Sequence, residues 1–186
     1  APALFAQTRT VDPEPVRHRS IALPAAPDAA TFRATMDTLL PPSFDDPCIE
    51  AGVVVYVVDE EWGFVPGMNG YLDKEKAQYF QFTGSAMYTI SEVWGYFAEA
   101  VAVQDGALSF KLYSVDEQTG APATLLGTSA ALSVSELVLG EEVIDPTPFI
   151  FEMPVAIQSD EFFVSCDLSA LYATEDTVSL YMTEDM

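Results

Sequence analysis

From Gly52 onwards, short runs of β-branched and aromatic residues alternate with turn residues, and this alternation constrains the fold more than any other feature. The first run, residues 53–58, ends at three acidic residues and predicts a buried strand too short to cross a bilayer. Turn signals such as Gln104-Asp105-Gly106 and Thr119-Gly120-Ala121-Pro122 separate later runs. Further strands are predicted at residues 79–82, 86–90, 93–103, 108–115, 131–134, 148–151, 162–168 and 178–182. Many short strands without a long helix predict an all-β fold, an antiparallel β-sandwich.

The N-terminal part of the chain has a different composition. Eight of the 13 prolines lie in the first 48 residues, and no glycine precedes Gly52. Proline fixes its own φ and favours an extended conformation for the residue before it, so residues 1–40 are predicted to form an extended arm. Within the arm, residues 28–40 fit either a short helix or an extended segment, because apolar residues at helical spacing alternate with threonines that form helices poorly. Residues 41–186 are predicted to form the sandwich domain.

The charges are divided unevenly between these two parts. The net charge is −22, with seven basic and 29 acidic residues; only three of the acidic ones, but four of the arginines, lie in residues 1–33. A body of this charge repels phosphate backbones and anionic lipids, so nucleic acid and membrane surfaces are not expected partners. Because 49% of residues are apolar, the body can still bury a core. Four acidic pairs are predicted to form a solvated rim of loops: Asp116-Glu117, Glu141-Glu142, Asp160-Glu161 and Glu175-Asp176.

A set of motifs in the body resembles a known family. The motifs are Pro41-Pro42-Ser43-Phe44, Asp46-Pro47-Cys48, residues 62–71 (WGFVPGMNGY), residues 73–78 (DKEKAQ), residues 120–128 and residues 160–164 (DEFFV). Across residues 40–183 the chain resembles a secreted, jelly-roll-like β-sandwich domain of exported proteins of Bacteroidetes and their relatives, often found upstream of a type IX secretion sorting domain. The resemblance implies this fold and a secreted, extracellular or cell-surface location, but no catalytic residues. Set against that family, residues 1–186 contain no sorting domain and are expected to lack the closing strand.

An early stop of this kind would leave an open strand position, which an extended segment can fill by β-augmentation. The arm supplies a candidate for the added strand. It combines apolar residues with arginines that would be attracted to the acidic body: Val11, Val16, Arg17, Arg19, Ile21 and Leu23. We therefore expect the arm to dock on a neighbouring subunit and build a homo-oligomer or polymer, with opposite charges steering the encounter. A linker folded back on its own domain, or an arm without a partner, is the open alternative.

The chain has two cysteines, Cys48 and Cys166. Export permits a disulfide between them, which would join the start of the domain to a late strand. The alternative is two unrelated buried thiols.

Catalytic constellations are not evident in the sequence. The single histidine, His18, stands between Arg17 and Arg19 in the arm, and neither a phosphate-binding loop nor a dinucleotide motif occurs. With 29 acidic residues, a glycosidase pair can be neither located nor excluded. The sequence therefore predicts a non-enzymatic structural or interaction module without a cofactor.

Calcium and glycans are the two ligand classes that the loops bring into consideration. Oxygen ligands for calcium could come from Asp59, Glu60, Asn69 and Asp73, although their spacing is not that of an EF-hand. An aromatic platform for a glycan could form from Trp62, Phe64 and Tyr71, whereas Trp94 is expected in the core. A glycan-binding or adhesion module is thus the alternative function.

Overall fold

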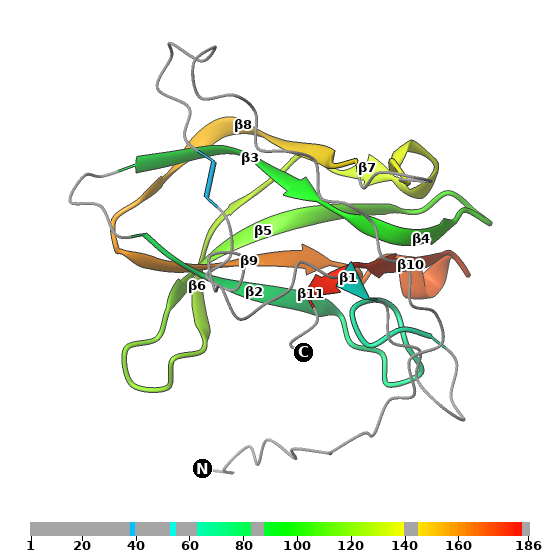
Figure 1. The fold of residues 1–186 in the computed structure, drawn as a ribbon, viewed down its shortest axis with the longest axis horizontal. Coiled ribbons are helices and arrows are strands. Elements are labelled where there is room, and N and C mark those ends of the chain that lie inside the picture. Colours follow the sequence, from blue (N-terminus) through cyan, green and yellow to red (C-terminus); the bar gives the residue numbers. More distant parts are fainter. Residues whose placement is uncertain (1–37, 40–52, 55–62, 83–87, 140–144, 184–186) are drawn as a thin grey trace.

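A computed structural model describes residues 38–39, 53–54, 63–82, 88–139 and 145–183. Within these residues the chain consists of antiparallel β-strands and short 3-10 turns, and it has no α-helix. The strands are β1 (Val53–Val54), β2 (Glu75–Gln81), β3 (Tyr88–Gly95), β4 (Phe97–Val101), β5 (Ala107–Val115), β6 (Pro122–Thr128), β7 (Leu132–Ser133), β8 (Thr147–Ile157), β9 (Glu161–Asp167), β10 (Thr177–Leu180) and β11 (Met182–Thr183). The all-β prediction is confirmed, and the arrangement is sandwich-like (Figure 1).

The largest sheet has the strand order β2-β9-β5-β6, and the short β7 also pairs with β5. The other strands form antiparallel pairs, β3 with β8, β4 with β10 and β1 with β11. Only one residue separates β3 from β4, so the β4–β10 pair follows the β3–β8 pair along the length of the molecule (Figure 1). Gly67, in the loop before β2, forms an antiparallel bridge with Ser179 and so attaches that loop to β10. A Cβ at Gly67 would clash with the backbone oxygen of Val178, so this close approach requires glycine.

One hydrophobic core joins the sheets. Phe149 of β8 packs against Phe110 of β5 and Phe97 of β4, with ring centroids 4.7 Å and 6.1 Å apart. Both Phe97 and Phe149 are fully buried. Leu39, from one of the two short described segments that precede residue 63, also packs against this core.

Most of the predicted strands are confirmed, with shifted ends. Strand β2 begins earlier than predicted, at Glu75, and β8 extends further, to Ile157. Strand β6 was not predicted, and its first residue, Pro122, was assigned to a turn. Pro122 occupies the first position of the strand, where a missing N–H is tolerated.

The prediction for Trp94 is wrong. Trp94 is 41% exposed, because strand alternation directs its neighbours Val93 and Gly95 to the core and Trp94 to the outside. Thr38 and Leu39, the two described residues of the helix considered at 28–40, are not helical. The rest of that segment lies outside the described residues, as do residues 55–58 of the first predicted strand.

Candidate functional site

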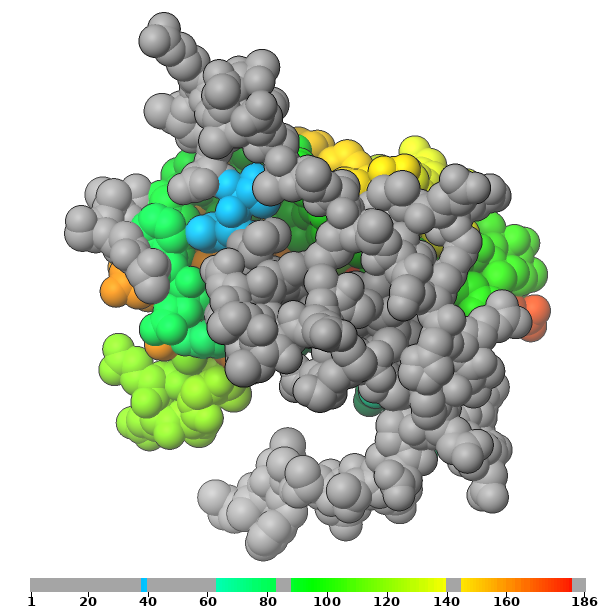
Figure 2. Space-filling view, in the orientation of Figure 1, coloured from blue at the N-terminus to red at the C-terminus, as the bar shows by residue number. Residues whose placement is uncertain are grey.

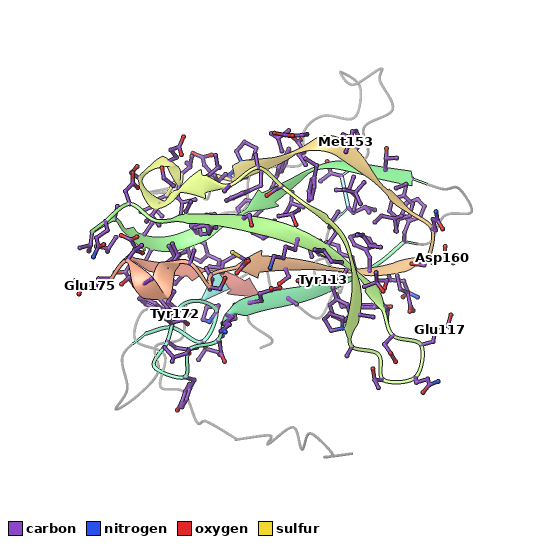
Figure 3. The ribbon with its side chains drawn as sticks, turned by 180° about the vertical axis from the view of Figure 1, so that it is seen from behind. Tyr113, Glu117, Met153, Asp160, Tyr172 and Glu175 are labelled. Atoms are coloured by element: carbon purple, nitrogen blue, oxygen red, sulfur yellow. The ribbon has the colours of Figure 1, made fainter. Side chains whose placement is uncertain are left out.

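The outer face of the β2-β9-β5-β6 sheet carries a row of large side chains that crosses all four strands. Tyr79 pairs with Phe163, Phe163 with Tyr113, and Tyr113 with Leu125. We call these four residues the outer row. The Tyr79 and Phe163 rings meet edge to face at 5.6 Å, and Leu125 is 49% exposed. Figure 3 shows Tyr113 on this face, away from the β3-β8 pair.

The outer row results from adjacent aromatic residues within single strands. Successive side chains in a strand point to opposite faces, so Phe80 and Phe162 turn to the core while Tyr79 and Phe163 turn outward. Phe80 and Phe162 stack on the core side with their centroids 5.4 Å apart. Both faces of this sheet are therefore apolar at this level, and only the inner face is covered by the core.

A polar network occupies the outer face on one side of the outer row. Lys111 Nζ lies 2.7 Å from Glu75 Oε1 and 2.7 Å from Asp167 Oδ2. The hydroxyls of Ser165 and Tyr113 donate to Glu75 at 2.8 Å and 3.1 Å. The network thus connects β2, β9 and β5 through their side chains.

The charges in this network stabilise one another. Burial disfavours the ammonium of Lys111, but Asp167 and Glu75 outweigh that effect and raise the pKa of Lys111. Burial also acts to raise the pKa of Asp167, and hydrogen bonds from Lys111 and Ser169 reverse the effect and lower it. Because the ammonium is held between two carboxylates, it is neither a free nucleophile nor a base. We assign the network to strand pairing.

The other side of the outer row is acidic without a matching base. Glu161 pairs with Gln81 across β2 and β9 and accepts a hydrogen bond from its side chain at 3.4 Å, and hydrogen bonding to Glu161 raises the pKa of the Tyr79 hydroxyl. Asp160 and Glu117 are exposed at the same end of the sheet (Figure 3). The β5–β6 loop that carries Glu117 projects from the body (Figures 1 and 2). Within the part of the chain that the structure describes, none of these three carboxylates forms an ion pair.

Asp176 contradicts the prediction that its acidic pair lies in a solvated rim. Its side chain is buried, and Oδ1 accepts the backbone N–H groups of Val103, Gln104 and Asp105 at 2.5, 2.9 and 3.2 Å. Oδ2 accepts the N–H of Gly106 at 2.6 Å. Burial alone would raise the pKa of Asp176, but these hydrogen bonds and one from Thr174 lower it well below its usual range. Asp176 therefore holds the β4–β5 turn.

The proposed calcium ligands Asn69 and Asp73 do lie together, in a loop held by protein hydrogen bonds. The side-chain Nδ2 of Asn69 donates to Asp73 Oδ2 at 3.0 Å. The side-chain Oδ1 of Asn69 accepts from the backbone N–H of Tyr71 at 3.1 Å. Lys76 Nζ approaches the same Asp73 oxygen at 2.6 Å and lowers the pKa of that carboxyl. The described residues contain no group of three potential metal-binding side chains. Calcium binding stays a prediction, and a cation at Asp73 would compete with Lys76.

The structure only partly places the other predicted site residues. Phe64 is half-buried and Tyr71 is 47% exposed, with no ring contact between them among the described aromatic pairs. Cys166 is buried, and burial raises the pKa of its thiol. The remaining predicted residues lie outside the described part: Val11, Val16, Arg17, Arg19, Ile21, Leu23, Cys48, Asp59, Glu60 and Trp62. The disulfide, the glycan platform at Trp62 and the assembly arm therefore stay predictions.

The outer row was not predicted from the sequence. A usable signal was present, since Tyr79-Phe80 and Phe162-Phe163 are adjacent aromatic pairs within predicted strands. Such a pair places one ring on each face of a sheet. What the sequence does not give is the register that aligns Tyr79, Phe163 and Tyr113.

Comparison with known proteins adds no assignment. The chain matches no protein-family model and shows no significant similarity to a curated protein or a solved structure. In the described residues, no helix has the length and apolar character needed to cross a membrane.

Proposed function

We propose that the protein is a non-enzymatic, extracellular structural or interaction module that assembles with copies of itself through its N-terminal arm. The observation that carries the proposal is the separation of charge along the chain. Residues 1–33 contain four arginines and three acidic residues, whereas the remainder has three lysines and 26 acidic residues. Opposite charge on arm and body favours contact between them over contact between two bodies.

The edge of the large sheet supports a strand-exchange mode of assembly. Among the described strands, β2 pairs only with β9, so one of its edges carries backbone groups with no described strand beside them. Such an edge accepts an extended segment by main-chain hydrogen bonding. The opposite edge strand, β6, lies close to β8, and just beyond β6 the Ala130 N–H donates to the Ile150 oxygen.

A non-enzymatic role agrees with how the described charges are used. Lys111, Asp167 and Asp176 hold strands and turns together. The finer assignments, a jelly-roll topology, secretion and membership of the Bacteroidetes-type family, belong to this proposal and rest on the sequence motifs.

A glycan-binding role is the second candidate, and the half-buried rings of the outer row, on the face of the sheet away from the core, favour it. Aromatic faces beside carboxylates and hydroxyls suit sugar rings. Because the surface is strongly acidic, the ligand would be a neutral glycan. Titration with neutral oligosaccharides should then shift the aromatic NMR signals of Tyr79 and Tyr113.

Removal of the arm tests the assembly proposal. We expect the full chain to form oligomers or polymers by light scattering at low salt, and a chain beginning at Ala34 to be monomeric. Higher salt should weaken assembly of the full chain, since the charges that steer it are screened. Circular dichroism of both proteins serves as the folding control. A full chain that remains monomeric at every salt concentration would refute the proposal.

A further inference from the structure

The edge of β2 that has no described strand beside it lies at one end of the outer row, and Glu161 lies one strand further in, on β9. A strand added to β2 would extend each cross-strand row by one residue, at a spacing of about 4.8 Å. Its outward side chains would stand next to Tyr79 and Gln81, and Glu161 is the neighbour of Gln81 on β9. This edge therefore favours a strand with an apolar residue two positions from a cation.

The sequence of the arm has this pattern at residues 17–23. In an added strand, alternation would put Arg17, Arg19, Ile21 and Leu23 on one face and His18, Ser20 and Ala22 on the other. The spacing from Arg19 to Ile21 equals that from Gln81 to Tyr79 when the two strands run antiparallel. Pro24 ends the segment, where it disturbs no pairing inside the strand.

Charge selects the direction of the added strand. In the antiparallel register with Ile21 beside Tyr79, Arg19 lies next to Gln81 and within reach of Glu161. In the parallel register with the same pairing, Arg19 would stand beside Ala77 and Arg17 beside Glu75. Glu75 is already bound by Lys111, whereas Glu161 has no basic partner among the described residues. Glu161 accepts a hydrogen bond from the Gln81 side chain at 3.4 Å but forms no ion pair among the described residues, and this favours the antiparallel register.

We propose that residues 17–23 of a second copy add to β2 as an antiparallel strand, with Ile21 extending the outer row at Tyr79 and Arg19 pairing with Glu161. This inference rests on the proposed assembly function and names its surface and register. The added strand would also cover the β2 edge and one end of the outer row.

Charge reversal in the full chain tests the register. We expect Arg19→Glu and Glu161→Arg each to weaken association about tenfold or more in sedimentation equilibrium at low salt. The double variant should recover most of the loss. Arg9→Glu and Glu117→Arg change the net charge equally, at positions outside the proposed contact, and should weaken association much less.

Mixing the two single variants decides whether docking occurs between copies. The Arg19 arm of the Glu161→Arg protein can dock on the Glu161 body of the Arg19→Glu protein, and the reversed pair can dock as well. Equal amounts of the two proteins should therefore associate nearly as well as the wild type. If association recovers in the double variant but not in the mixture of single variants, the arm docks on its own body. That result would overturn exchange between copies.

Further outcomes separate this inference from the proposed function. If truncation at Ala34 abolishes assembly but Arg9→Glu weakens it as much as Arg19→Glu, the register is wrong while arm-mediated assembly stands. If truncation has no effect, both fail. Should Glu161→Arg not fold, Glu161→Gln provides the test, because it should weaken wild-type association and remove the further effect of Arg19→Glu.

Discussion

Replacing Asp176 with alanine is expected to lower the free energy of unfolding by about 3 kcal/mol. The carboxylate accepts four backbone N–H groups from residues 103–106, and the substitution leaves all four without their acceptor. Water can replace part of the loss, because Val103, Gln104 and Asp105 are exposed. The expected decrease in melting temperature, followed by circular dichroism, is roughly 6–12 °C.

The contribution of Asp176 should depend on pH in a defined direction. Its hydrogen bonds lower the pKa of the folded state below the value of about 3.9 expected in the unfolded chain. The stabilisation is therefore fully present above about pH 4 and is lost as the pH falls towards the folded-state pKa. The wild type should lose more stability than Asp176→Ala between about pH 5 and pH 2.

Two further variants define the cause. Asp176→Asn keeps the size and one acceptor oxygen but presents an NH₂ group to one side of the turn. Its free energy of unfolding should therefore lie between those of the wild type and Asp176→Ala. Glu117→Ala removes an exposed carboxylate from another loop and should change stability by less than about 0.5 kcal/mol. Equal stability of Asp176→Ala and Glu117→Ala would show that the turn does not depend on this carboxylate.

The example of Asp176 shows why part of the structure could not be predicted. The pair Glu175-Asp176 looks in sequence like Asp116-Glu117 and Asp160-Glu161, where Glu117 and Asp160 are exposed, and the hydrogen-bond partners of Asp176 lie 70 or more residues earlier. Strand positions were predictable because alternation and turn residues act locally, as at Gln104-Asp105-Gly106, where Asp105 has a φ of +55°. Proline at the start of β6 shows the limit of that local information.

The candidate surface divides in the same way. Adjacent aromatic residues predict that one ring of each pair faces outward, but only strand order and register bring Tyr79, Phe163 and Tyr113 into one row. The polar network is likewise non-local, since Glu75 and Asp167 meet Lys111 from two different strands. A lysine in a strand carries no sequence signal that it will lie between two carboxylates.

Replacing Lys111 with methionine should lower the free energy of unfolding by about 2 kcal/mol, less than the loss for a fully buried ion pair because the lysine side chain is 20% exposed. Methionine retains the apolar stem, so the change isolates the charge. Without the ammonium, Glu75 and Asp167 face one another as unpaired anions across β2 and β9. Lys74→Met removes an exposed ammonium one residue before β2 and should cost less than about 0.5 kcal/mol.

The loss caused by Lys111→Met should be greatest near neutral pH. Pairing lowers the pKa of Asp167, so its stabilisation is present above the unfolded value of about 3.9 and disappears as the pH falls below it. Denaturant unfolding should therefore show a smaller difference in the free energy of unfolding between wild type and Lys111→Met at pH 3 than at pH 7. Adding Glu75→Gln to the Lys111→Met protein should raise its free energy of unfolding by about 1 kcal/mol at pH 7, because it removes one of the two facing charges. If Lys111→Met is as stable as Lys74→Met at pH 7, the network contributes nothing to strand pairing, and its carboxylates would be free to bind a cationic partner on the same face as the outer row.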